Sequence, residues 1–168
     1  ELLDPGIEPE RLAEGFIWTE GPCYVPARSR LVFSDVRADR TWAWTDDDRL
    51  EPEDSPSRHA NGHTLDAAGR LIACSHGDRA LKRQEEDLSW TTLADSFEGK
   101  RLNSPNDVAR HSDGSLWFTD PTYGIDKPEE GYGGEQELPG RWVFRLDAGG
   151  TLSAAARALD VTPPALSM

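Results

Sequence analysis

The fold is decided by residues 106–120, which read Asn106-Asp107-Val108-Ala109-Arg110-His111-Ser112-Asp113-Gly114-Ser115-Leu116-Trp117-Phe118-Thr119-Asp120. A polar residue opens this stretch, a short apolar segment follows, and Asp113-Gly114 separates it from a second segment. Asp-Gly is a strong hairpin signal, because the turn requires positive φ. The stretch therefore predicts two antiparallel strands that begin beside Asn106.

The same pattern occurs twice earlier in the chain. Residues 20–35 begin with Glu20-Gly21-Pro22 and end with a second apolar segment, and residues 61–74 repeat the arrangement from Asn61-Gly62 onward. The opening polar residues Glu20, Asn61 and Asn106 are 41 and 45 residues apart. A period of this length is typical of one blade of a β-propeller.

Further segments complete each unit. Alternating residues that suit half-buried strands occupy 40–44, 80–83, 90–93 and 141–146. We therefore predict an all-β propeller with four-stranded antiparallel blades, forming one domain over residues 1–168. An antiparallel β-sandwich is the alternative, but the equivalent polar residue at the start of each unit favours the propeller. Residues 126–140, rich in Gly, Pro and Glu, form a long insertion of the kind that is often functional or mobile.

The charge and hydropathy of the chain limit the kinds of molecule that we expect it to bind. The chain carries 18 Lys and Arg against 31 Asp and Glu, a formal net charge of −13. An acidic surface repels phosphate, so we expect no nucleic acid partner. No apolar run approaches the roughly 18 residues that cross a bilayer, and no signal peptide is visible. We expect no membrane partner and a cytoplasmic location, although a chain that begins at Glu1 leaves room for an upstream segment.

Several motifs together resemble one protein family. They are Glu20-Gly21-Pro22, Asn61-Gly62, His76-Gly77-Asp78-Arg79, Leu102-Asn103-Ser104-Pro105-Asn106-Asp107-Val108 and Trp117-Phe118-Thr119-Asp120-Pro121-Thr122-Tyr123-Gly124. The ordered set, from about Glu10 to Leu159, resembles the regucalcin (senescence marker protein)/gluconolactonase family, in its bacterial gluconolactonase-like branch. The resemblance implies a six-bladed propeller with one divalent metal at the mouth of the central channel. It also implies hydrolysis of a sugar lactone, such as glucono-1,5-lactone to gluconate.

The resemblance assigns roles to particular residues. Glu20 matches the metal-binding glutamate of the first blade, and Asn106 matches an asparagine near the metal that contacts substrate; we take both as metal ligands. Ca²⁺ is the usual metal, and some members use Zn²⁺, Mg²⁺ or Mn²⁺. Ser104 falls where regucalcin has a substrate-binding arginine, and Pro164 falls where the family has a further asparagine ligand. The catalytic aspartate of the family would lie beyond Met168, so no catalytic residue is predicted within this chain.

Other candidate substrate-binding residues follow from position. Asn61 shares the inward position of Glu20 and Asn106, and either binds substrate or caps a turn. Asn103 either contacts substrate or stabilises its loop. His76, like His63, either donates to sugar hydroxyls or is structural. Tyr123 lies at a strand end, where it could stack on a sugar ring.

These residue types suit metal-assisted lactone hydrolysis. A hard cation on oxygen ligands polarises a carbonyl as a Lewis acid. A glutamate supplies charge, whereas neutral asparagine oxygens leave the metal electrophilic. Each innermost strand of a propeller places one residue at the channel mouth, so ligands about 40 residues apart meet in space.

Three functions stay open at this stage. The first is a calcium-dependent lactonase, the second an inactive propeller fragment that serves as a binding or assembly module, and the third a related esterase or organophosphatase on the same scaffold. The family resemblance implies that the chain covers about the first three of six blades. Three blades leave two open sheet faces, which we expect the remaining half or self-association to cover.

Overall fold

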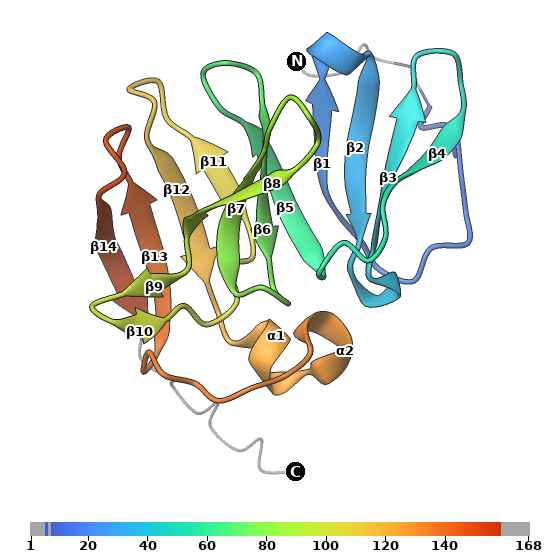
Figure 1. Cartoon of the computed structure of the whole chain (residues 1–168). Helices are drawn as coiled ribbons and strands as arrows, with labels where there is room; N and C mark the ends of the chain where they lie inside the picture. The colour runs from blue at the N-terminus through green and yellow to red at the C-terminus, as the bar shows by residue number, and fades with distance from the viewer. Residues whose placement is uncertain (1–5, 7, 159–168) are drawn as a thin grey trace.

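The computed structural model describes residues 6 and 8–158. The strands in this part of the chain form three four-stranded antiparallel sheets and a two-stranded ribbon. In each large sheet the strands follow in chain order (Figure 1). Blade 1 contains β1 (Thr19–Val25), β2 (Arg30–Asp35), β3 (Arg40–Thr45) and β4 (Leu50–Asp54). Blade 2 contains β5 (Ala60–Leu65), β6 (Leu71–Ser75), β7 (Ala80–Gln84) and β8 (Trp90–Ala94). Blade 3 contains β11 (Val108–Arg110), β12 (Leu116–Asp120), β13 (Arg141–Leu146) and β14 (Leu152–Ala158), and β9 (Ser96–Phe97) pairs with β10 (Lys100–Arg101) in the ribbon.

The predicted four-stranded antiparallel blades are confirmed. The segments expected at 40–44, 80–83, 90–93 and 141–146 lie in β3, β7, β8 and β13. Neighbouring sheets meet along their first strands, because β1 and β11 both contact β5. A β-sandwich would instead stack its sheets face to face. Residues 159–168, which include Pro164, lie outside the described part of the chain, so the domain boundary at 168 stays a prediction.

Two glycines allow the first strands to approach one another. A Cβ added at Gly21 would lie 2.2 Å from the carbonyl oxygen of Asn61, and one at Gly62 would lie 2.8 Å from the carbonyl oxygen of Asn106. Gly21 also has a φ of +57°, which L side chains rarely adopt. Each Gly therefore stands where the backbone of the next blade passes, immediately after a predicted site residue.

The core lies between successive blades. Phe118 and Phe144 of blade 3 are fully buried against Ile72 and Leu81 of blade 2, with ring centroids of the two phenylalanines 5.5 Å apart. A smaller cluster of Val25, Val32 and Leu71 joins blade 1 to blade 2. Side chains on one face of each sheet thus fix the angle between neighbouring blades, and with it the relative positions of their first strands.

The insertion between β12 and β13 spans residues 121–140 and so begins earlier than the predicted 126–140; it contains two short helices, α1 (Tyr123–Asp126) and α2 (Pro128–Gly131). Both helices lie at one end of the sheets (Figure 1). The insertion reaches back to blade 1, where Glu130 pairs with Arg37 at 2.7 Å and the Tyr132 hydroxyl donates to Asp39 at 2.6 Å. The insertion therefore covers the ends of blades 1 and 2. No helix among the described residues is long and apolar enough to cross a membrane.

Candidate functional site

A cavity of about 350 Å³ collects most of the predicted site residues. The lining residues are Trp18, Glu20, Val36, Asn61, His76, Asn106, Tyr123, Lys127 and Glu130. Of the residues predicted to bind metal or substrate, Glu20, Asn61, His76, Asn106 and Tyr123 are thus brought together.

Glu20 and Asn61 each lie at a β-bulge in the first strand of their blade. The register of β1 against β2 shifts between Glu20 and Cys23, and that of β5 against β6 shifts between Ala60 and His63. Such a bulge re-aims the side chains beside it. Asn106 precedes β11, and its backbone is held on both sides: its N–H donates to Thr119 at 2.9 Å and its carbonyl accepts from Gly62 at 2.8 Å.

His76 links the two asparagines to the insertion. Its Nε2 lies 3.3 Å from Nδ2 of Asn61 and 3.1 Å from Nδ2 of Asn106, while its Nδ1 lies 2.9 Å from the carbonyl oxygen of Glu130. The side chain is buried, and burial lowers the pKa of His76 to about 4. The imidazole is therefore neutral at pH 7.

The two carboxylates in the cavity have different partners. Oε1 of Glu20 accepts the indole N–H of Trp18 at 3.2 Å. Glu130 accepts from Arg37 at 2.7 Å and from Lys127 at 3.3 Å. Burial opposes ionisation of Glu130, but these two cations outweigh it and lower the pKa of its carboxyl group. Glu130 is therefore an ionised part of the wall that is held by the protein.

Asn103 and Ser104 are not part of the lining of the cavity. Asn103 is fully buried; its amide donates to the carbonyl of Gly140 at 3.0 Å, and its backbone N–H donates to Asp120 at 2.8 Å. The Ser104 hydroxyl donates to the carbonyl of Pro121 at 2.6 Å and accepts from Gly124 at 3.0 Å. These contacts hold the loop before β11 against α1. His63 is likewise outside the lining, with Nδ1 2.9 Å from the carbonyl oxygen of Gly21.

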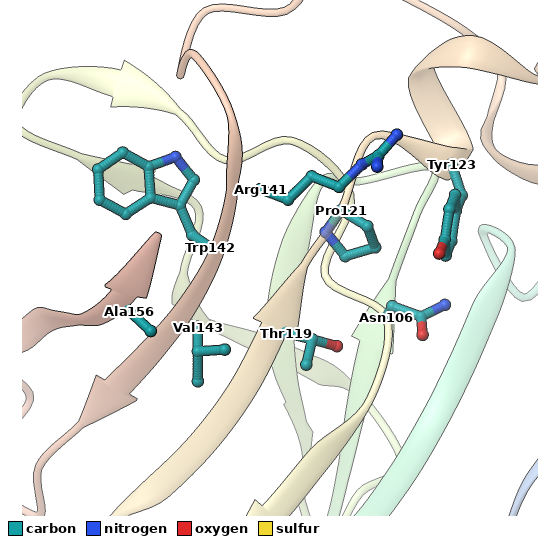
Figure 2. A pocket seen from close by; sticks show the side chains of 8 residues that line it. All are labelled: Asn106, Thr119, Pro121, Tyr123, Arg141, Trp142, Val143 and Ala156. Atoms are coloured by element: carbon teal, nitrogen blue, oxygen red, sulfur yellow. The ribbon is translucent and has the colours of Figure 1, made fainter. Parts of the chain in front are cut away.

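A second cavity, of about 430 Å³, adjoins the first and shares Asn106 and Tyr123 with it. Figure 2 shows these two side chains on one side and Trp142 and Ala156 on the other. Although this cavity is larger, its other lining residues are Pro121 and residues of β12, β13 and β14, and its surface is mainly apolar. The smaller cavity holds the chemical groups, so we assign the candidate site there. Tyr123, which is 43% exposed, stands between the two.

Sequence reasoning missed four residues of the lining: Trp18, Val36, Lys127 and Glu130. Trp18 is two residues from Glu20, and Arg37 lies over its ring at 4.9 Å from the centroid. Lys127 and Glu130 belong to the insertion, whose length and composition indicated a functional segment but not which of its side chains would face the site. Contacts between residues 93 positions apart, as for Arg37 and Glu130, leave no local pattern.

The donor set fits a hard divalent cation. Glu20 offers a carboxylate and Asn61 and Asn106 offer amide oxygens, which are the ligand types that Ca²⁺ prefers. The Nε2 lone pair of His76 is already engaged by two amide N–H groups, so the imidazole is not available as a ligand. No group of three or more His, Cys, Asp or Glu side chains arranged for a metal occurs among the described residues. The amides of Asn61 and Asn106 would therefore have to complement Glu20.

Comparison with known proteins gives a consistent picture. The profile of the SMP-30/Gluconolactonase/LRE-like region matches residues 18–162. A gluconolactonase of Zymomonas mobilis is 32% identical over 165 residues, covering 90% of this chain and 46% of that protein. The X-ray structure of a provisionally assigned gluconolactonase, a structural genomics target, is 68% identical with a TM-score of 0.90, covering 93% of this chain and 54% of the other. A gluconolactonase of Xanthomonas campestris is 37% identical with a TM-score of 0.83, covering 87% and 50%.

A more distant structure agrees in fold. The calcium-binding protein regucalcin of Agrobacterium tumefaciens is 16% identical with a TM-score of 0.59. The propeller architecture predicted from the repeat is thereby confirmed for the part that this chain covers. The chain spans about half the length of these relatives.

Proposed function

The chain belongs to the SMP-30/gluconolactonase/LRE-like family, and from this premise we propose that its cavity serves the hydrolysis of a sugar lactone with the help of a divalent cation, of which Ca²⁺ fits best. The observation that carries the proposal is the meeting of Glu20, Asn61 and Asn106, from three successive blades, at one cavity. The spacing of 41 and 45 residues brings them together, and all three side chains carry oxygen atoms that can serve as cation ligands. Glucono-1,5-lactone is the proposed substrate, because gluconolactonases are the relatives at 32 and 37% identity.

The proposed roles follow from the contacts. Glu20 and Asn106 would hold the cation, and Asn61 would lie beside them as a ligand or as a contact to substrate. A bound cation supplies Lewis acid chemistry that polarises the lactone carbonyl. Tyr123 offers a ring face to the sugar, and Lys127, whose Nζ lies 5.8 Å from the centre of that ring, offers a donor to sugar hydroxyls.

Regucalcin has a substrate-binding arginine at the position of Ser104. In this chain, the insertion would form that side of the cavity. Ser104, at that position, is buried and bonded to Pro121 and Gly124, so it does not reach a substrate. Tyr123 begins α1, Lys127 lies between α1 and α2, and both line the cavity. We therefore propose that the insertion takes over substrate selection in this chain.

No described residue is proposed as the base that deprotonates the attacking water. Glu130 is tied to Arg37 and Lys127, and Glu20 is assigned to the cation. The proposal therefore concerns cation binding and substrate orientation by this chain.

The first test measures calcium binding and lactone hydrolysis on the same protein. Calorimetry with Ca²⁺ and a pH-stat assay with glucono-1,5-lactone, with EDTA and after addition of Ca²⁺, give the two readouts. We expect E20Q to weaken calcium binding by more than about tenfold, since it removes the charged ligand. E86Q is the matched control, because Glu86 is an exposed glutamate in the turn before β8.

Calcium binding that is equal in wild type and E20Q would contradict the assignment of Glu20. A rate that EDTA does not change, together with no calcium binding, would remove the lactonase proposal in favour of a binding or assembly module. Faster hydrolysis of aryl esters than of lactones would indicate the related esterase.

A further inference from the structure

The protonation of His76 can be worked out from its partners. Nδ1 faces the carbonyl oxygen of Glu130 at 2.9 Å, and a carbonyl can only accept a hydrogen bond. Nδ1 therefore carries the proton and donates it. Nε2 faces the Nδ2 groups of Asn61 and Asn106, which can only donate, so Nε2 is the acceptor and its lone pair points at them.

This tautomer fixes which way both amides face. Only an N–H group can meet a lone pair, so Asn61 and Asn106 each present their Nδ2 to His76, at 3.3 and 3.1 Å. The oxygen and nitrogen of an amide lie on opposite branches of one plane, so each Oδ1 is turned away from the imidazole. The opposite orientation would set two further lone pairs against that of Nε2.

We propose that His76 is a positioning residue that holds the side-chain amides of Asn61 and Asn106 with their carbonyl oxygens presented to the cavity. One imidazole nitrogen thereby orients oxygen donors from two different blades. The other nitrogen ties this arrangement to the insertion through Glu130. Both ring nitrogens are engaged in this way, so His76 makes no direct bond to substrate.

The packing around His76 supports this role. The side chain is 1% exposed, and its backbone N–H donates to the carbonyl of His59 at 3.1 Å. Gly124 of α1 lies against it so closely that an added Cβ would be 2.7 Å from Cβ of His76. The ring therefore has little freedom to rotate away from the asparagines. The orientation of the two amides follows from these contacts alone. Its role in holding a cation rests on the proposed cation site.

Two substitutions of His76 test the contacts of Nδ1 and those of Nε2 separately. In H76Q the side-chain oxygen can stand near the position of Nε2 and accept from both asparagines. In H76N the shorter amide can still donate to Glu130 but cannot reach Asn61 and Asn106. A role in packing alone would be disturbed by both changes, whereas an orienting role is lost only in H76N.

Calcium affinity is the first readout, measured by calorimetry on folded protein, with far-ultraviolet circular dichroism as the check of folding. Removing a group that orients a metal ligand usually costs about 10- to 100-fold in affinity. We expect that loss for H76N and retention of most of the affinity for H76Q. Equal losses in both variants, or wild-type affinity in folded H76N, would overturn the orienting role.

The second readout needs no metal. In nuclear magnetic resonance spectra of the metal-free chain, we expect the side-chain amide protons of Asn61 and Asn106 to exchange slowly with solvent in wild type and H76Q, and faster in H76N. If calcium does not bind but the amide protons behave in this way, the cation site is wrong and the role of His76 stands. If H76N leaves amide exchange unchanged, the role of His76 is wrong whatever calcium does.

Discussion

Asp120 offers a direct test of how burial controls charge beneath the site. It ends β12, it is fully buried, and its Oδ2 accepts the backbone N–H of Asn103 at 2.8 Å. Burial is the main influence and raises the pKa of Asp120 from its ordinary 3.8 to about 7, although the N–H groups of Asn103 and Ser104 and the charge of Arg79 oppose it. The perturbation is D120N, which keeps an oxygen for Asn103 but cannot ionise.

The sign and size of the effect follow from linkage. Between pH 3.8 and about 7 the unfolded chain releases the proton of Asp120 while the folded chain keeps it, so the wild type loses stability as pH rises. The contribution is fully present below pH 3.8 and is lost as pH rises through about 7. At 1.36 kcal/mol per pKa unit, the total loss is about 4 kcal/mol. The free energy of unfolding of D120N, relative to wild type, should therefore increase by up to about 4 kcal/mol between pH 4 and pH 8.

The assay is urea denaturation of wild type and D120N at several pH values, followed by tryptophan fluorescence. Comparing the two proteins at each pH cancels the pH dependence of all other groups. D113N is the control, because hydrogen bonds from Ser115 and His111 lower the pKa of Asp113 below its ordinary 3.8. This carboxyl is ionised in both the folded and the unfolded chain above about pH 5, so the stability of D113N relative to wild type should stay constant from there to pH 8. A difference between D120N and wild type that is constant from pH 4 to pH 8 would contradict the raised pKa of Asp120.

Two further predictions concern the approach of the blades and the insertion. G62A should lower the free energy of unfolding by about 1–3 kcal/mol in urea denaturation, because the added Cβ would lie 2.7 Å from Cα of Asp107; an unchanged midpoint would show that the blades can separate at no cost. R37L should increase hydrogen exchange of residues 127–132, measured by mass spectrometry, because it removes the 2.7 Å bond to Glu130 that ties the insertion to blade 1. Unchanged exchange would mean that Tyr132 and His76 hold the insertion without Arg37.

The repeat in the sequence was sufficient to predict both the blades and the residues that meet. Alternating segments separated by turns, such as Asp113-Gly114, predict four-stranded sheets, and spacings of 41 and 45 residues place Glu20, Asn61 and Asn106 at equivalent points of successive sheets. Convergence then follows from geometry, since the first strands of a propeller surround one axis. The glycines after Glu20 and Asn61 belong to the same repeat, and the structure gives their reason in the close contact between blades.

Residues placed by packing could not be predicted in the same way. Asn103 and Asn106 lie in one short motif, yet only Asn106 reaches the cavity, because the backbone N–H of Asn103 caps Asp120 and its side chain is drawn inward. Lys127 and Glu130 enter the site only because the insertion folds over blade 1, through contacts to Arg37 and Asp39 that are more than 90 residues away in sequence. Such contacts depend on the assembled blades rather than on any local pattern.

Glu20 and Glu130 both line the cavity, but their different contacts suit them to different roles. Two cations, Arg37 and Lys127, contact Glu130, and their charges offset its own, so it adds little attraction for an incoming cation. Glu20 accepts from the neutral indole of Trp18, whose N–H orients the carboxylate without reducing its charge. Arg37, which lies over the same indole, also pairs with Glu130. At the proposed cation site, a divalent cation would therefore be drawn to Glu20 and to the amide oxygens that His76 is proposed to orient, and Glu130 would hold the insertion in place.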